Sequence, residues 1–326
     1  MRAMVTGGAG FIGSNLVDRL LAEGHEVDVV DDLSTGTLAN LAAARSNPAH
    51  EMSFFNLDIR SDEIVELIAR RKPGVIFHLA AQADVRVSVA RSVFDADVNI
   101  LGSLRVLEGA RFVDGARVVF AASGGTLYGE PEPGKLPITE SSPHRPLSPY
   151  AVSKKAVIDY LHAYRELHDI EFSALALANV YGPRQDVHGE AGVIAIFASH
   201  LLTGGTCTVY GDGTQTRDFI YVDDVVDAFV RSAERGGGLV MNIGTGVETS
   251  VNDLYTTMEH LAGVDCPPLH KPGRPGELHR NSLDPSRAAL HLGWKPWTRL
   301  DDGIRALLDY LAAAGNGTSS PATAGS

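Results

Sequence analysis

The chain has 326 residues, of which 44% are hydrophobic and 21% are charged, and its formal net charge at pH 7 is -12. This length and composition are typical of a globular protein with a large core, and we expect two lobes. The negative charge argues against binding to nucleic acid or to an acidic membrane surface, because no basic patch is evident. Small anionic ligands are not excluded, since a few arginines can override the net field locally.

The two cysteines, Cys207 and Cys266, show neither metal-ligand spacing nor a disulfide framework. We interpret them as packing residues suited to a reducing cytosol, and we expect no metal site. The N-terminus lacks a charged lead followed by an apolar signal core, and no segment approaches membrane-spanning length. We therefore expect a cytoplasmic protein without a membrane anchor. Residues 314–326 are small, polar and aperiodic, which predicts a disordered tail.

The first predicted element is a short apolar strand that runs directly into a glycine-rich turn. Gly7 and Gly10 would let the backbone turn tightly and approach a pyrophosphate, and Gly13 would allow close packing where the strand passes into a helix. Glycine-rich turns also serve as ordinary connections, so the spacing alone does not identify a ligand. In this position it predicts a phosphate-binding turn.

A second predicted strand, at residues 25–30, ends in two carboxylates, Asp31 and Asp32. Their distance from the glycines is close to that of an acid that accepts hydrogen bonds from ribose hydroxyls. The alternative is a surface carboxylate without a ligand. Strand, glycines, helix, strand and acid in this order predict a dinucleotide site, and NAD is favoured over NADP because a carboxylate repels a ribose phosphate.

Apolar runs then alternate with helical patterns, with strands expected at 75–79 and 117–121 and a helix near 95–110. This alternation predicts an α/β fold, a Rossmann-type doubly wound parallel sheet. Ligands on such sheets bind beyond the carboxyl ends of the strands. The residues that follow strand-like runs, and are therefore site candidates, are Ala80, Ala81, Gln82, Ser123 and Asn179.

Tyr150 and Lys154 lie four residues apart, just after Pro149, which favours a helix start. On a helix this spacing places the phenol and the ammonium on one face, so that the cation can favour the phenolate. The phenol could then act as a base near neutral pH, helped by a positive nicotinamide. The same spacing occurs by chance on many helices, and the pair gains weight from the dinucleotide turn in the same chain.

These motifs and several longer blocks resemble the extended short-chain dehydrogenase/reductase family, and within it the nucleotide-sugar 4-epimerases of the UDP-galactose epimerase type. The resemblance spans nearly the whole chain. The blocks that carry it are residues 6–13, 31–36, 78–82, 150–154, 179–184, 210–219 and 292–296. It implies NAD as the cofactor and a reaction in which a hydride leaves C4 of a UDP-sugar and returns to the opposite face of a 4-keto sugar.

The resemblance also assigns cofactor contacts in a lobe made of residues 1–180 plus 220–245. Asp31 would hold the adenosine ribose, Asp58 and Ile59 would flank the adenine, and Lys154 would hold the nicotinamide ribose. Tyr150 would be the base. The other implied cofactor residues are Gly7, Gly10, Phe11, Ile12, Asp32, Ser34, Thr35, Gly36, Leu79, Ala80, Ala81, Gln82, Asn99 and Ala121.

The UDP-sugar is implied to bind a smaller α/β lobe, residues 181–219 plus 246–313. Arg217 and Arg274 would bind the diphosphate, because guanidinium groups fit phosphate oxygens. Glu277 would contact the uridine ribose and Tyr210 would frame the uracil. The other implied substrate residues are Arg86, Thr126, Asn179, Arg184, Gly192, Val193 and Gln215, with residues 189–193 forming a substrate loop.

The chain departs from the family pattern at two positions. Gly124 stands where the family usually carries the catalytic serine or threonine, and residues 123–125 resemble a Ser-Gly-Gly variant of some epimerases, which leaves Ser123 and Thr126 as alternatives. We favour Thr126 as the hydroxyl near the substrate and Ser123 as a cofactor neighbour, although either could bond its own backbone in a turn. Leu177 replaces a tyrosine of many relatives, so the nicotinamide face must be held differently.

The expected function is an NAD-dependent UDP-sugar 4-epimerase, acting on a UDP-hexose or a UDP-hexuronate. Arg86 or Arg184 could receive a C6 carboxylate and favour the hexuronate, but Arg184 can equally be architectural. A lyase on the same scaffold is one alternative. Gly124 and Gly125 supply no acid pair for a dehydratase, and Thr126 stands where decarboxylases commonly carry glutamate.

A non-catalytic NAD sensor is the other alternative, and it would not need Tyr150 or Lys154. The helices near 95–110 and 153–167 resemble the pair that joins two subunits in relatives. A homodimer is expected by this analogy, although a long amphipathic helix can also pack within its own domain.

Overall fold

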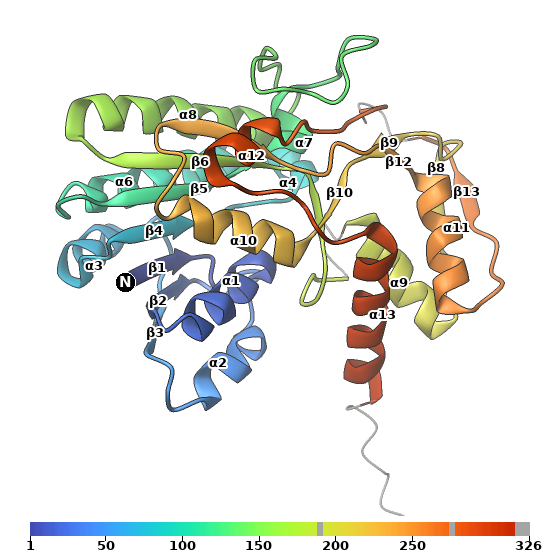
Figure 1. Ribbon diagram of the computed structural model, residues 1–326, viewed down its shortest axis with the longest axis horizontal. Helices are drawn as coiled ribbons and strands as arrows, with labels where there is room; N and C mark the ends of the chain where they lie inside the picture. The colour runs from blue at the N-terminus through green and yellow to red at the C-terminus, as the bar shows by residue number, and fades with distance from the viewer. Residues whose placement is uncertain (188–191, 274–277, 317–326) are drawn as a thin grey trace, which may run out of the picture.

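The computed structural model describes residues 1–187, 192–273 and 278–316, and its centre is a seven-stranded sheet in the order β11-β6-β5-β4-β1-β2-β3 (Figure 1). All neighbouring strands are parallel. This arrangement confirms the predicted doubly wound sheet. The strands are β1 (Arg2–Thr6), β2 (Glu26–Asp31), β3 (Met52–Asn56), β4 (Val75–His78), β5 (Arg117–Ser123), β6 (Glu171–Leu177) and β11 (Leu239–Ile243).

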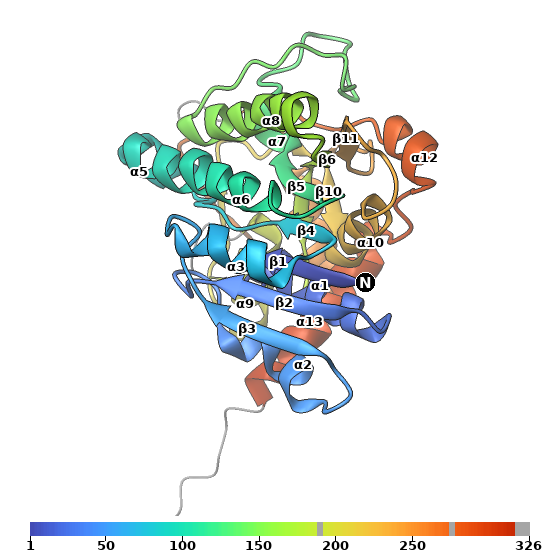
Figure 2. The same cartoon turned by 90° about the vertical axis from the view of Figure 1, so that its left-hand side faces the viewer.

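Helices cover both faces of the sheet, which explains why its central strands are nearly continuous apolar runs. Figure 2 shows α3, α6 and α8 along one face and α10 and α12 along the other. The helices of this layered part of the chain are α1 (Phe11–Ala22), α2 (Ala42–Ser46), α3 (Glu63–Arg71), α4 (Val85–Ala90), α5 (Ser92–Ala96), α6 (Ser103–Ala110), α8 (Pro149–His168), α10 (Val222–Ser232) and α12 (Ser286–Leu292). Of these, α2, α4 and α5 pack against other helices. The short helix α7 (Gly124–Leu127) directly follows β5.

The helix expected near 95–110 begins earlier, at Ser92, and consists of three contiguous segments. Helix α5 passes into a π-helical turn, η2 (Asp97–Gly102), which continues as α6. Single π-turns inside helices are frequent at functional sites. The turn carries Asn99, one of the expected cofactor residues, into the buried space beneath the loop that follows β4.

A smaller group of elements lies beside the sheet, at the right of Figure 1. Helix α9 (Val193–Thr203) packs against α11 (Val251–Ala262) and α13 (Leu300–Asn316). Its strand pairs are β8 (Thr208–Tyr210) with β13 (Leu269–Lys271), and β9 (Thr216–Arg217) with β12 (Thr249–Ser250). At the junction with the sheet, β7 (Asn179–Tyr181) pairs in parallel with β10 (Phe219–Tyr221).

The packing differs from the expected boundaries of the smaller lobe at two places. Helix α12 packs against α10 and β11 of the larger layer, and Trp294 Nε1 donates a hydrogen bond to Asp224 O of α10 at 2.8 Å. Residues 286–294 therefore pack with the sheet. Helix α13 continues to Asn316, past the point where a tail was expected, because the alanines at 312–314 favour helix. Residues 317–326 lie outside the described part of the chain.

Within the described ranges, no helix is both long and apolar enough to span a membrane.

Candidate functional site

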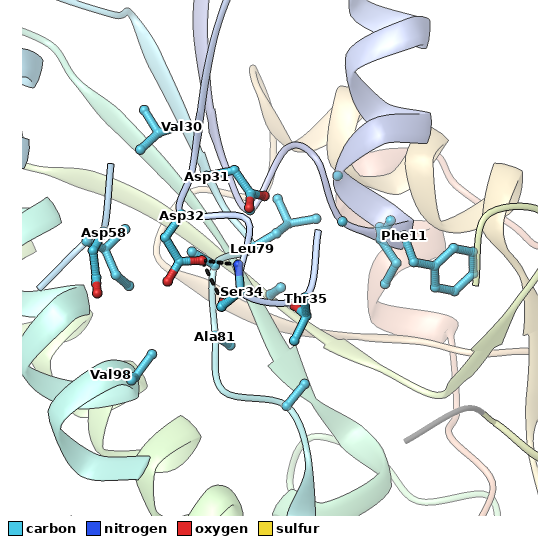
Figure 3. Close-up of a pocket in the computed structure, with 18 of the residues that line it drawn as sticks. Phe11, Val30, Asp31, Asp32, Ser34, Thr35, Asp58, Leu79, Ala81 and Val98 are labelled. Atoms are coloured by element: carbon cyan, nitrogen blue, oxygen red, sulfur yellow. Dashed lines mark hydrogen bonds between the residues drawn. The ribbon is translucent and has the colours of Figure 1, made fainter. Parts of the chain in front are cut away.

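A pocket opens beyond the carboxyl ends of β1, β2, β4 and β5, where a parallel sheet of this kind places its ligand. Figure 3 shows Asp32, Ser34, Thr35 and Asp58 around part of it, with Phe11 on another side. The expected cofactor residues that line it are Gly7, Gly10, Phe11, Ile12, Asp31, Asp32, Ser34, Thr35, Asp58, Ile59, Leu79, Ala80, Ala81, Ala121, Tyr150 and Lys154. Gly36, Gln82 and Asn99 do not line it.

The glycine turn is built so closely that side chains do not fit. Gly7 has a φ of +71°, and a Cβ on it would lie 2.7 Å from Ala80 N. A Cβ on Gly13 would overlap Gly7 O. The turn therefore needs glycine for its conformation at one position and for close packing at the other.

The N-terminus of α1 faces this pocket without a protein cap. Gly10 is the N-cap and offers no side chain, and the first turn contains no acidic residue. The first amides of a helix have no intrahelical acceptor, and the helix dipole adds a partial positive charge. The N-terminus of α1 therefore fits the pyrophosphate of a dinucleotide.

Two carboxylates at the end of β2 line the pocket in different ways. Asp31 is buried, and its two oxygens accept hydrogen bonds from Ala9 N and Leu33 N, each at 2.9 Å. Burial raises its pKa above the usual value. Asp32 is exposed and accepts from Ser34 N and Ser34 Oγ, the contacts drawn in Figure 3. A Cβ on Gly36 would lie 2.8 Å from Asp31 Oδ1, so this glycine lets the loop close over the acid.

The side chain of Asp58 is held at the edge of the pocket by an ion pair with Arg60 at 2.5 Å. The Arg60 hydrogen bonds lower the pKa of Asp58. Ile59, beside it, is buried against Gly102 of η2, where a Cβ would lie 2.7 Å from Ile59 Cδ1. Asp58 therefore lies at the rim of the pocket and Ile59 in its wall.

Gln82 and Asn99 support the pocket from behind. Gln82 N donates to Asn99 Oδ1 at 2.9 Å, and Asn99 Nδ2 donates to Gln82 O at 2.9 Å. Both side-chain amides also donate to Asp95 Oδ1. Asp95 was not predicted from the sequence, because a single carboxylate on a short helix whose Val93 is exposed gives no local signal.

Lys154 is buried on α8, one turn after Tyr150. The helix begins with Ser148, whose Oγ accepts from Ala151 N, and with Pro149 at its first position. Lys154 Nζ donates to Ala121 O at 3.0 Å and lies 5.7 Å from the centroid of the Tyr150 ring. Burial lowers the pKa of Lys154 to about 8, because it disfavours the charged form.

The phenol of Tyr150 is not activated by the chain alone. Burial raises its pKa to about 12, and the hydrogen bond to Ser123 opposes this rise. The expectation that Lys154 would favour the phenolate is thus outweighed by desolvation. A further positive charge near the phenol is needed to bring its pKa toward neutrality.

The polar side chains of Ser123, Thr126 and Asn179 differ in what they contact. Ser123 hydrogen-bonds Tyr150, whereas Thr126 Oγ1 is buried and has no partner among the described residues. Asn179 Oδ1 is likewise buried without a described partner. A Cβ on Gly125 would lie 3.8 Å from it. Buried polar atoms normally have partners, so this pair fits a polar ligand.

Leu177 lines the pocket at the end of β6. It offers an apolar surface where the family resemblance implies a tyrosine. Other lining residues that sequence reasoning did not name as cofactor contacts are also small or apolar, and their chemistry gives no signal in a single sequence. They are Gly13, Val30, Leu57, Ala83, Val98 and Ala122.

Both arginines considered for a C6 carboxylate already contact a carboxylate of the chain. Arg86 is exposed and lies 3.2 Å from Asp84. Arg184 Nη2 donates to Asp18 Oδ2 of α1 at 2.5 Å, and the residue has a φ of +71°. Its Nη1 is buried without a described partner. The position of Arg184 is thus set by α1.

The remaining substrate candidates lie around the smaller group of elements. Gly192 precedes α9 and Val193 begins it. Gln215 Nε2 donates to Tyr210 O at 2.9 Å, and Arg217 Nη1 donates to Thr216 O at 2.8 Å. Arg274, Glu277 and loop residues 189–191 lie outside the described residues.

The model of the NAD dependent epimerase/dehydratase family matches residues 3–244. The chain belongs to this family. NAD is the cofactor of the family, and the uncapped helix N-terminus, the close-packed glycines and the acids after β2 fit that cofactor.

The chain is also similar to individual members of the family. It is 49% identical to a UDP-glucose 4-epimerase of Mycolicibacterium smegmatis over 95% of this chain and 98% of the relative. A UDP-glucose 4-epimerase of Thermotoga maritima, solved with UDP-glucose, is 39% identical and superposes with a TM-score of 0.92 over 96% of this chain and 99% of that one. A UDP-glucose 4-epimerase of Thermus thermophilus, solved with NAD, is 40% identical with a TM-score of 0.87 over 96% and 100%.

Proposed function

We propose that the protein is an NAD-dependent UDP-sugar 4-epimerase, with UDP-glucose and UDP-galactose as its first candidate pair. The observation that carries this proposal is the arrangement of Tyr150 and Lys154 in the wall of the dinucleotide pocket, with Ser123 hydrogen-bonded to Tyr150. The similarity to three UDP-glucose 4-epimerases supports it. A sensor would bind the dinucleotide without needing a buried acid–base group.

The reaction requires a proton and a hydride to leave the sugar together. NAD, when bound, supplies the acceptor and then the donor of the hydride at C4. Tyr150 Oη takes the proton of the C4 hydroxyl and returns it to the same oxygen after the 4-keto sugar has presented its other face. Ser123 orients the phenol through its hydrogen bond, and the Lys154 ammonium, fixed by Ala121 O, stabilises the phenolate. We assign the unpartnered Thr126 Oγ1 and Asn179 Oδ1 to hydroxyl groups of the sugar, and the Asn179 NH₂ to the phosphates, because only the NH₂ can donate to them.

A neutral hexose is favoured over a hexuronate by the ion pairs of the two candidate arginines. Arg86 contacts Asp84 and Arg184 contacts Asp18, so each cation is already balanced by a carboxylate. A C6 carboxylate would have to compete with these partners. UDP-glucuronate and UDP-galacturonate are therefore the second candidate pair.

We also propose that two chains form a homodimer. Exposed apolar side chains gather on α4, α5 and α8, with Val89 66%, Val93 83% and Val152 49% exposed. These three helices pack against one another, so their exposed valines contribute to one apolar surface. An exposed apolar patch of this kind is typical of a protein interface. Light scattering should report a dimer, and V93E with V152E should give monomers, whereas V247E, at an exposed valine elsewhere, should not.

Two further expectations stay part of this proposal. We propose that the protein works in the cytoplasm, because both of its cysteines are free thiols. We also propose that the sheet lobe binds NAD and the group of α9, α11 and α13 binds the nucleotide sugar.

The proposal is tested with Y150F and T203S as a matched control on α9. Tyr150→Phe should retain NAD, because its ring still fills the pocket wall, but should lose at least about a hundredfold in kcat on UDP-glucose. Thr203→Ser keeps the hydroxyl that bonds Ser199 O and should turn over normally. Full turnover by Tyr150→Phe would overturn the assignment of the base.

A further inference from the structure

A buried carboxylate lies behind the Tyr150–Lys154 face of α8. Asp95, on α5, is 0% exposed, and its carboxylate is not paired with an arginine in any described contact. Burying a charge in this way is costly unless hydrogen bonds and nearby opposite charge stabilise it. We propose that Asp95 is a positioning residue of the reaction, a fixed counter-charge to Lys154 that also ties the catalytic helix to the loop over the cofactor pocket. This inference rests on the proposed function.

The geometry shows a carboxylate shared between two parts of the site. Asp95 Oδ1 accepts from Gln82 Nε2 at 3.1 Å and from Asn99 Nδ2 at 2.9 Å. Asp95 Oδ2 accepts from Ser153 Oγ at 2.6 Å. Ser153 directly precedes Lys154 on α8, and Gln82 directly follows the pocket residues Ala80 and Ala81. One side chain therefore links the wall of the cofactor pocket to the helix of the base.

The same network fixes the backbone of the pocket loop. Asn99 bonds both the N–H and the C=O of Gln82, and Gln82 Oε1 accepts from Asp84 N at 2.7 Å. Asp84 in turn caps α4 by accepting from Arg86 N and Val87 N. The position of loop 80–84 is thus set relative to Asp95 by side-chain amides whose own partners are satisfied.

Among the charged groups near Asp95, Lys154 is the cation that the Asp95 carboxylate stabilises. Asp95 acts electrostatically on both Lys154 and Tyr150 and raises the pKa of each. His78, on β4, also faces Lys154, but burial lowers its pKa to about 3 and keeps it neutral. The other charges on the packed elements have partners of their own: Arg60 with Asp58 and Asp97, Arg86 with Asp84, Arg91 over the Phe94 ring, and Lys155 with Asp159.

The Asp95 charge therefore has opposite consequences for Lys154, which it keeps charged, and for Tyr150, whose phenolate it disfavours. Without the Asp95 charge, desolvation would lower the pKa of Lys154 further, which disfavours the ammonium. The pKa of Tyr150 would fall as well, from about 12, because a nearby negative charge disfavours the phenolate. The charge of Asp95 therefore keeps Lys154 positive at the expense of a more basic phenol.

The deciding variant is D95N, because it removes the charge and can keep the network. The amide oxygen of an asparagine can accept hydrogen bonds from Gln82 and Asn99. Its NH₂ can donate to Ser153 Oγ, because a hydroxyl can accept as well as donate. The matched control is S153A, which removes one hydrogen bond and leaves the charge. Under a purely structural role D95N should titrate like the wild type and any change should be confined to S153A, which loses a hydrogen bond. Under a role through charge D95N should change and S153A should not.

The first readout uses the protein without any UDP-sugar, so it does not depend on the proposed function. The ultraviolet absorbance of tyrosinate is followed against pH, and each curve is corrected by the same variant carrying Tyr150→Phe. In D95N the pKa of Tyr150 should fall by about one unit, and in S153A it should stay at the wild-type value. An unchanged Tyr150 titration in D95N, or an equal shift in S153A, would overturn the inference.

The second readout is the pH profile of kcat/KM on UDP-glucose. In D95N the alkaline limb should move toward acid by about one pH unit, which lowers the rate on that limb about tenfold, while S153A keeps the wild-type limb. Calorimetry with NAD at neutral pH checks that the pocket is intact in both. If the wild type epimerises no UDP-sugar, the proposed function fails, and the tyrosinate titration still decides the role of Asp95.

A second variant covers the case in which D95N does not fold. Gln82→Lys keeps a donor on Asp95 and neutralises its charge, and Gln82→Met removes the donor with a similar shape. The pKa of Tyr150 should fall in Gln82→Lys by at least half a unit more than in Gln82→Met. Equal titrations in these two variants would contradict the inference.

Discussion

Leu283 occupies the space that a side chain at Gly124 would need, just after the end of β5. A Cβ on Gly124 would overlap Leu283 Cδ1 and lie 2.9 Å from Ala176 O, and Leu283 is completely buried. The family resemblance implies a serine or threonine at the position of Gly124, and the described packing leaves no room for such a side chain. Leu283 fills that space, and Ser123, one residue earlier, supplies the hydroxyl that bonds Tyr150.

We therefore expect G124S to be destabilised by about 1–3 kcal/mol, since overpacking forces neighbours to move. Leu283→Ala alone should cost about 2–5 kcal/mol because it leaves a cavity. In the double variant the serine enters the vacated space. The loss of unfolding free energy in the double variant should therefore be smaller than the sum of the two single losses by at least about 0.5 kcal/mol. Urea unfolding of the four proteins measures this coupling, and strict additivity would show that the two side chains do not share the space.

Ser123 and Thr126 should respond differently to loss of the hydroxyl. Ser123→Ala removes the partner of Tyr150 and should lower kcat about a hundredfold. Thr126→Val keeps the shape and removes an unpartnered oxygen, so it should act mainly on KM. Steady-state kinetics on UDP-glucose separate the two. A larger loss of kcat in Thr126→Val would assign the catalytic hydroxyl to Thr126 instead.

Gly7→Ala should weaken NAD binding and keep the fold. The residue has a φ of +71°, and its Cβ would lie 2.7 Å from Ala80 N in the wall of the pocket. We expect NAD affinity to fall at least about tenfold, or 1.4 kcal/mol, by calorimetry. Gly24→Ala is the control, because it has a similar φ of +77° with no atom within 4 Å of the added Cβ. Equal NAD affinity in both variants would contradict the assigned role of the turn.

His78 should make stability depend on pH below neutrality. Its Nδ1 accepts from Thr6 Oγ1 at 2.7 Å and its Nε2 donates to Ser103 Oγ at 2.8 Å, because Ser103 Oγ itself donates to Asn99 O. Burial lowers the pKa of His78 from 6.5 to about 3. Between these values the unfolded chain binds a proton that the folded chain does not, so stability falls as pH falls.

The measurement is the free energy of unfolding from pH 7 to pH 4 in the wild type and in H78Q. The wild type should lose up to about 1.4 kcal/mol per pH unit more than the variant below pH 6.5. Parallel curves would show that His78 takes up its proton in the folded state. The carboxylates cancel in this comparison, since both proteins carry the same ones.

The sequence predicted the sheet and the cofactor pocket well because their signals are local. Glycines that must turn tightly, apolar strands and acids at strand ends each follow from neighbouring residues, as at Gly7 and Asp31. The role of Gly124 could not be predicted, because the cause lies at Leu283, far along the chain. Asp95 was missed for the same reason, since its partners Gln82, Asn99 and Ser153 meet only in the folded protein.

The most direct test of the account is to incubate the purified protein with UDP-glucose and, separately, with UDP-glucuronate, and to follow the products by NMR without added NAD. The account predicts that UDP-galactose grows in the first tube until the two epimers reach equilibrium, with little change in the second. If neither tube yields an epimer even after NAD is added, or if a decarboxylated or keto product accumulates, the epimerase assignment is contradicted.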